Sequence, residues 1–206
     1  MFSVVGDTYS IQDFYLIDLS LNNGALKELD NKTQLTAYIN TMTDHGGKPI
    51  AYGGYGEERD FYLKSPLFSG ERRTIHLGID VWLPIGHPVY AATSGQIYGK
   101  AYNNQYLDYG YTVILKHMVN DEALFALYGH LSAKDFDSLI VGDTVDSGDI
   151  IAYVGDESQN GGWAPHLHFQ LIRNIGGYQS DYPGVCHMSQ KEKCLENCPD
   201  PTRWIL

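Results

Sequence analysis

His76-Leu-Gly-Ile-Asp80 and His166-Leu-His168 are the two stretches that decide how this 206-residue chain is interpreted. On an extended strand, side chains at positions i, i+2 and i+4 point to the same face. His76 and Asp80 are therefore expected on one face of one strand, and His166 and His168 on one face of another. If these strands lie side by side in a sheet, four metal-binding or acid–base groups meet in one pocket. The two stretches predict a hydrolytic metalloenzyme.

The residues around the first stretch favour a strand over a helix, although a four-residue spacing also fits one face of a helix. Ile75 and Ile79 are β-branched, and Gly78 lies inside the stretch. Glycine weakens a helix, and β-branched residues are enriched in strands. We therefore expect His76 and Asp80 to belong to a β-strand.

The second stretch follows a glycine-containing loop, Gly161-Gly-Trp-Ala-Pro165, and precedes the apolar run Phe169–Ile172. This order predicts a shaped loop that leads into a buried strand. A single histidine on a strand is more often a packing or surface residue than a ligand. Two histidines on one face, His166 and His168, strengthen the case for a functional site.

The composition is typical of a mainly β protein. The chain holds 22 glycines and 16 tyrosines, and its apolar residues fall in short runs separated by turn sequences. Tyrosine is enriched in strands, and glycine supplies the turns between them. The strands expected from these runs are Val89–Ala92, Gln96–Tyr98, Thr112–Lys116, Ala123–Tyr128, Ile150–Val154 and Leu167–Ile172.

The pattern of short apolar runs covers only the middle of the chain. We therefore expect an N-terminal extension (1–65) that packs on the core, a core (66–178) and a polar C-terminal tail (179–206). The extension is predicted to be a small α-helical and irregular part. In it, Asn31-Lys-Thr33 indicates the start of a helix and His45-Gly-Gly47 its end.

The formal charge of −11 argues against nucleic acid as a partner, because binding it needs clustered Lys and Arg. No stretch approaches the roughly 18 consecutive apolar residues of a membrane span. The first seven residues lack the pattern of a secretory signal, which predicts a cytoplasmic protein. A chain trimmed of its signal would look the same, so a periplasmic or secreted location stays open. None of these features predicts an oligomeric state.

His130 stands in Tyr128-Gly-His-Leu131, at the end of a predicted strand. Alternation along that strand places it on the same face as Ala126 and Tyr128. Taken alone, the position indicates a histidine on the solvent side of a strand end.

The three cysteines all lie in the tail, at Cys186, Cys194 and Cys198. With His187 they could form a small structural zinc site. Their spacing lacks the usual Cys-x-x-Cys pattern, which favours free thiols.

In combination, these residues resemble the lysostaphin-type zinc metallopeptidases, the family of lysostaphin and LytM. The two signatures of that family, His-x-x-x-Asp and a later His-x-His, stand here in order. The resemblance covers about residues 70–173 and implies an antiparallel β-sheet core that forms a groove. Further segments that resemble the family in order are Gly86-His-Pro-Val-Tyr90, Gly110-Tyr-Thr-Val-Ile-Leu-Lys-His117, Tyr128-Gly-His-Leu131, Val141-Gly-Asp-Thr-Val145, Gly148-Asp-Ile-Ile-Ala152 and Ala164-Pro-His-Leu-His-Phe169.

The resemblance implies that His76, Asp80 and His168 hold one zinc ion, and that His130 and His166 are the catalytic histidines. Three protein ligands leave a fourth position for water, as catalytic zinc sites require. The implied activity is that of a zinc metalloendopeptidase acting on a peptide or a peptidoglycan fragment, often next to glycine. The resemblance does not decide which of the two histidines is the general base.

Sequences on both sides of the core resemble a particular branch of this family. In that branch a lysostaphin-type domain is fused between a kinase-like domain and a class-III aminotransferase domain. The matching segments are Gly53-Gly-Tyr-Gly-Glu-Glu-Arg59, Tyr182-Pro-Gly-Val185 and Pro199-Asp-Pro201. Membership of this branch would imply a small peptide or amide inside the cell as the substrate.

Two alternative functions belong to other classes. One is a catalytically silent peptide-binding or regulatory module that keeps the zinc groove, plugged by residues 45–60. The other is a structural zinc protein that relies on the cysteine tail. The presence of all five site positions favours the active peptidase over the silent binding module.

Overall fold

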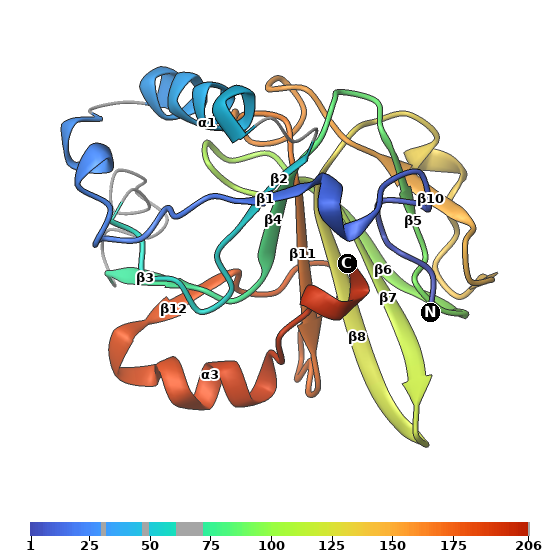
Figure 1. The fold of residues 1–206 in the computed structure, drawn as a ribbon. Helices are drawn as coiled ribbons and strands as arrows, with labels where there is room; N and C mark the ends of the chain where they lie inside the picture. The colour runs from blue at the N-terminus through green and yellow to red at the C-terminus, as the bar shows by residue number, and fades with distance from the viewer. Residues whose placement is uncertain (30–31, 47–49, 61–71, 206) are drawn as a thin grey trace.

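A large β-sheet forms the centre of the structure, a computed structural model that describes residues 1–29, 32–46, 50–60 and 72–205. Its strands are β1 Phe14–Leu16, β2 Ile50–Gly53, β4 Ile79–Trp82, β6 Gly95–Asn103, β7 Gly110–Val119, β8 Glu122–Leu131, β9 Thr144–Val145 and β11 Leu167–Ile172. They lie in the order β1-β2-β4-β11-β8-β7-β6-β9 (Figure 1). Neighbouring strands are antiparallel except for β1 and β2, which are parallel.

Two smaller antiparallel pairs accompany this sheet. β5 (Pro88–Tyr90) pairs with β10 (Ile150–Tyr153), and β3 (Arg73–His76) pairs with β12 (Val185–His187). The mainly β fold predicted from the sequence is confirmed. Each predicted strand overlaps an observed one, and the predicted strand at residues 167–172 coincides with β11.

Helices are few and short. The α-helices described are α1 Lys32–Gly46 and α3 Lys191–Asn197, and the 3-10 helices are η1 Ile11–Asp13, η2 Gly24–Glu28, η4 Phe136–Ser138, η5 Met188–Gln190 and η6 Thr202–Trp204. Among the helices of the described residues, none combines the length and apolar character needed to cross a bilayer. The predicted helix corresponds to α1, while Asn31, Gly47 and the expected boundary at 65/66 lie outside the described residues.

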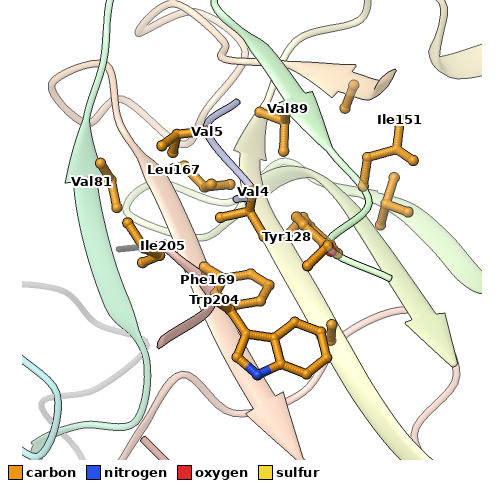
Figure 2. Close-up of a cluster of buried hydrophobic side chains, with 14 of the residues drawn as sticks. Val4, Val5, Val81, Val89, Tyr128, Ile151, Leu167, Phe169, Trp204 and Ile205 are labelled. Atoms are coloured by element: carbon orange, nitrogen blue, oxygen red, sulfur yellow. The ribbon is translucent and has the colours of Figure 1, made fainter. Parts of the chain in front are cut away.

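The main hydrophobic core lies on one face of β11. Leu167, Phe169 and Leu171 alternate into it and are almost fully buried. Tyr128 from β8 and Val81 from β4 pack beside them (Figure 2). Because side chains alternate along a strand, His168 between Leu167 and Phe169 must point to the other face. The core therefore fixes the direction of a candidate ligand.

Both ends of the chain enter the same core. Val4 and Val5 from the N-terminus and Trp204 and Ile205 from the C-terminus are buried against the strand residues (Figure 2). The backbone N–H of Val4 donates to the Trp204 carbonyl at 3.0 Å. A fully buried side chain of this size contributes about 1.5–3 kcal/mol, so these contacts anchor both ends of the chain to the sheet.

A separate apolar cluster joins part of the N-terminal segment to strands β2 and β4. Leu19 and Ile39 are buried there with Ala51 of β2, and Trp82 of β4 packs against them. In Figure 1, α1 lies over the end of β2. The extension thus reaches the strand that carries Asp80.

Candidate active site

Asp80 and His168 stand directly opposite each other, because the register of β4 and β11 pairs these two residues. His76 reaches the same point from the end of β3. His76 Nε2 lies 3.0 Å from His168 Nδ1 and 3.3 Å from Asp80 Oδ1, and the last two atoms are 3.1 Å apart. All three side chains are buried. Within the described residues, this is the group of His, Cys, Asp and Glu side chains that could hold a metal ion.

The stretch from His76 to Asp80 is two strands rather than one, so the prediction of a single strand is wrong. The chain leaves β3 after His76 and enters β4 at Ile79. A Cβ at Gly78 would lie 2.7 Å from both the His168 ring and the carbonyl oxygen of Phe169. Real atoms do not approach so closely, so glycine is required where the break packs against β11. The break lets His76 and Asp80 converge although they pair with different strands.

Hydrogen bonds fix the tautomer of each imidazole in the metal group. His76 Nδ1 lies 2.9 Å from the Gly54 carbonyl oxygen, and His168 Nε2 lies 3.0 Å from Oε1 of Gln170. These two oxygens accept, so each of these nitrogens carries the proton. The opposite nitrogens, His76 Nε2 and His168 Nδ1, then face each other with lone pairs. Hydrogen bonds of this kind orient metal-binding histidines in proteins.

The donor set fits a zinc ion. Two lone-pair nitrogens and a carboxylate oxygen converge and repel one another unless a cation lies between them. A tetrahedral site with bonds of about 2.0–2.1 Å places its ligand atoms about 3.3 Å apart, which is close to the separations seen here. Two neutral imidazoles and one carboxylate are ligands that zinc accepts.

Asp80 is ionised within this group. Burial opposes the charge, but the His76 ring and the Arg59 guanidinium hold the pKa of Asp80 well below its usual range. Burial lowers the pKa of His76 to about 4, against the attraction of Asp80. Both residues are therefore in the protonation states that metal binding needs at neutral pH.

Two further histidines lie beside the metal group, with ring centroids 4.2 Å apart. His130 Nδ1 donates to the Asn160 carbonyl at 2.9 Å, and His166 Nδ1 donates to the Ala164 carbonyl at 2.7 Å. Each ring thus keeps a lone pair on Nε2. Burial, above all, lowers the pKa of both rings, so both are neutral bases at neutral pH. His166 Nε2 lies 3.7 Å from Asp80 Oδ1.

His130 reaches this position because of a bulge in β8. Its backbone is left-handed, with φ of 63°, which is uncommon for a residue with a side chain. The pairing of β8 with β7 shifts register at the same point. Tyr128 belongs to the main core, but the bulge turns His130 to the site face. The expectation that alternation places His130 with Ala126 and Tyr128 is therefore wrong.

Aromatic side chains surround the two histidines. Trp82 stacks on His166 with ring centroids 5.8 Å apart, and Trp163 meets His130 edge-on at 6.3 Å. Tyr109 lies 5.7 Å from the His130 ring. A cavity of about 360 Å³ opens here between the core and the extension. Its lining includes Leu19, Leu35, Ile39, Trp82, Tyr109 and Trp163 together with His130, His166 and His168.

Acid is expected to destabilise the metal-free protein because His76, His130 and His166 are buried as neutral rings. Their folded-state pKa values are below the unfolded value of about 6.5. Above pH 6.5 both states are neutral and the stability is fully present. As the pH falls from about 6.5 toward 4, the unfolded chain binds protons that the folded chain excludes. A ring with a folded pKa of about 4 then contributes about 1.4 kcal/mol less to stability by pH 5.5.

Urea unfolding of the metal-free protein at pH 7.5 and 5.5 measures this effect. The midpoint is expected to fall at pH 5.5, and less steeply in His166→Gln, which lacks one of the rings. A midpoint that does not change between the two pH values would contradict burial of the histidines as neutral rings.

The sequence did not point to two residues that contact the ligands. Gln170 follows His168 by two positions on the same face of β11, so alternation could have predicted it. Arg59 donates to Asp80 Oδ2 at 2.6 Å from a separate segment, and no local pattern indicates that contact.

The three cysteines are free thiols outside the metal group. Cys198 Sγ accepts from Nε2 of Gln170 at 3.4 Å. Burial raises the pKa of Cys186 and of Cys198 to about 12. Within the described chain, the cysteines do not join any group with the spacing of a metal site. The tail therefore gives no support to a structural zinc protein.

Three converging side chains that could hold a metal ion, beside two neutral histidines on the face of a β-sheet, define the class of site found in metal-dependent hydrolases. A comparison with protein families matches residues 74–181 to Peptidase family M23, which is just over half of the chain. The chain belongs to Peptidase family M23. The family predicted from the sequence motifs is confirmed.

Part of the chain is also similar to curated proteins and to a solved structure. The chain is 38% identical to lysostaphin of Staphylococcus staphylolyticus over 121 residues, covering 59% of this chain and 22% of that protein. It is 35% identical to glycyl-glycine endopeptidase ALE-1 of Staphylococcus capitis over 99 residues, covering 48% of this chain and 25% of that protein. The matches thus span about a quarter or less of these relatives. The solved catalytic domain of lysostaphin from Staphylococcus simulans aligns with 82% of this chain and 96% of its own, with a TM-score of 0.49 and 24% identity.

Proposed function

We propose that this protein is a zinc-dependent endopeptidase that hydrolyses peptide bonds of peptidoglycan type or in glycine-containing peptides. One observation carries the proposal. Three buried ligand atoms lie within 3.3 Å of one another, beside two histidines whose Nε2 atoms hold lone pairs. Membership of Peptidase family M23 supports the same class of reaction.

His76 Nε2, Asp80 Oδ1 and His168 Nδ1 would hold the zinc ion. When bound, zinc acts as a Lewis acid that polarises the scissile carbonyl and lowers the pKa of a water molecule to about 7. The Gly54 carbonyl and the Gln170 side chain keep the two imidazole nitrogens aimed at one point. The ligands therefore need little rearrangement.

His130 and His166 would move the protons. A neutral Nε2 accepts the proton of the water that attacks the scissile carbonyl. The imidazolium that results donates this proton to the nitrogen of the leaving amine. The other ring would hydrogen-bond the tetrahedral oxyanion when its Nε2 carries a proton. Their Nδ1–H bonds to the carbonyls of Asn160 and Ala164 stop either ring from rotating away.

The cavity wall limits access of bulk water to these rings. Trp82 covers one face of His166, and Trp163 closes the edge of His130. Apolar walls strengthen electrostatic interactions inside a site. An extended peptide could lie along the cavity with its scissile bond at the histidines.

The substrate class rests on the relatives. One of them is named a glycyl-glycine endopeptidase, and this supports a glycine-containing peptide for the present chain. The resemblance to the branch fused with kinase-like and aminotransferase domains stays a prediction. It would favour a small peptide or amide over the cell wall.

Digestion of a peptide library and of purified peptidoglycan, each with zinc-loaded protein, tests the proposal. We expect new product masses that correspond to addition of one water at a peptide bond, with glycine enriched at the cleaved position. The matched control is His166→Ala, which should form these products at least roughly 100-fold more slowly at the same protein concentration. Peptide binding without any new product would instead indicate the silent binding module. Cleavage of small peptides but not of peptidoglycan would favour the intracellular substrate.

A further inference from the structure

The second carboxylate oxygen of Asp80 is held by an arginine from the N-terminal extension. Arg59 Nη1 donates to Asp80 Oδ2 at 2.6 Å, while Asp80 Oδ1 faces the two histidine ligands. Both side chains of the ion pair are 6% exposed. We propose that Arg59 is a positioning residue that occupies Oδ2 and so makes Asp80 a ligand through one oxygen. This inference rests on the proposed zinc site.

Arg59 is itself fixed by a second carboxylate. Its Nε lies 2.6 Å from Glu57 Oε2, and Glu57 Oε1 accepts from the backbone N–H of Leu19 at 2.9 Å. The backbone N–H of Arg59 donates at 2.8 Å to the carbonyl of Thr74, a residue of β3. The guanidinium is therefore anchored at both ends before any metal binds. Its planar fork suits this bridging geometry between two carboxylates.

Gly54 shows how closely this network is packed. Its φ is +81°, and a Cβ there would overlap both Arg59 Nη2 and Glu57 Oε2. The carbonyl of the same residue accepts the proton of His76 Nδ1. One short segment, residues 54–59, thus supports two of the three metal ligands. This segment lies before residue 74, where the match to Peptidase family M23 begins.

Two opposing effects decide whether a substitution at Arg59 strengthens or weakens zinc binding. Its permanent positive charge repels a zinc ion, so removing the charge would tighten metal binding if charge alone mattered. The ion pair also fixes the orientation of Asp80, and losing such a partner of a metal ligand typically weakens metal affinity 10- to 100-fold. Asp80 is buried, so a lost partner leaves an uncompensated carboxylate that must reorient. The positioning effect is therefore expected to dominate.

Freeing Oδ2 has a further consequence, because a carboxylate can bind a metal through one oxygen or two. Cobalt(II) reports the difference, since its visible absorption is strong in four-coordinate sites and weaker in five-coordinate ones. A cobalt spectrum therefore tests the position of Asp80 directly, without any measurement of activity.

The experiment compares the full chain with Arg59→Met and Arg59→Lys, and with Arg173→Met as a control. Arg173 is exposed, and its Nε donates to the backbone carbonyl of Glu196 at 3.2 Å. Zinc affinity is measured by competition with a chelator, and cobalt binding by visible absorption. We expect Arg59→Met to weaken zinc binding 10- to 100-fold and to lower the cobalt absorbance. The zinc affinity and cobalt absorbance of Arg59→Lys should lie between those of Arg59→Met and the unaltered protein. Arg173→Met should match the unaltered protein in both measurements.

Equal or tighter zinc binding by Arg59→Met, with an unchanged cobalt spectrum, would overturn the positioning role. If the unaltered protein binds neither ion, the zinc site of the proposed function fails instead, so the two failures are distinguishable. Should Arg59→Met not fold, Glu57→Gln weakens only the support of the guanidinium. It is expected to change affinity and spectrum in the same direction by a smaller factor, and no change in either would overturn the proposal.

Discussion

Replacing His76, Asp80 or His168 by alanine is expected to remove zinc from the protein. The three side-chain atoms lie 3.0–3.3 Å apart in a buried pocket, and each would supply one of the three protein ligands of the proposed zinc site. With two ligands left, the site loses both affinity and the geometry of a catalytic zinc centre. Metal analysis after dialysis should give close to one zinc per unaltered chain and close to none for each variant.

Folding must be separated from metal loss in this experiment. Circular dichroism of the metal-free variants checks that the sheet persists, since the main core lies on the other face of β11. His87→Ala is a matched control, because its ring bonds the Val5 carbonyl outside the site. Full retention of zinc by all three ligand variants would show that the ligand assignment is wrong.

The parts of the site that were predictable share one property, which is that they depend on short-range periodicity. The run around His168 alternates strictly, so its direction followed from the apolar neighbours Leu167 and Phe169. The side-by-side pairing of the two motif strands also matches the expectation, since Asp80 pairs with His168. The same alternation would have found Gln170.

The parts that were not predictable depend on contacts between distant segments or on a backbone irregularity. Glycine is required at the break because β11 packs against residue 78, and that contact joins residues far apart in the chain. His130 leaves the face assigned by alternation because its backbone is left-handed. Arg59 hydrogen-bonds Asp80 only because the chain folds back to bring residue 59 next to β4. Periodicity carries no signal for any of these.

Replacing His130 or His166 by alanine is expected to leave zinc in place and to slow hydrolysis roughly 100- to 10,000-fold, as for the loss of a general acid–base group. Neither ring belongs to the three-ligand group, and both present a neutral Nε2 to the cavity. The two losses should combine to less than their product in the double variant, because the rings act on one proton path. Initial rates are measured on a peptide identified by the digestion, with zinc content determined in the same samples.

The two variants should also differ in their side effects, which makes the test more specific. His130 holds a left-handed backbone position, so His130→Gly is expected to relieve local strain and to raise the unfolding midpoint relative to His130→Ala.

His166 stacks on Trp82, so His166→Ala also exposes an indole face, and His166→Phe restores the stacking without the base. If His166→Phe retained full activity with full zinc, stacking rather than proton transfer would be the role of this residue. A proton-transfer role requires both His166 variants to be equally slow, because neither side chain can accept a proton from the attacking water.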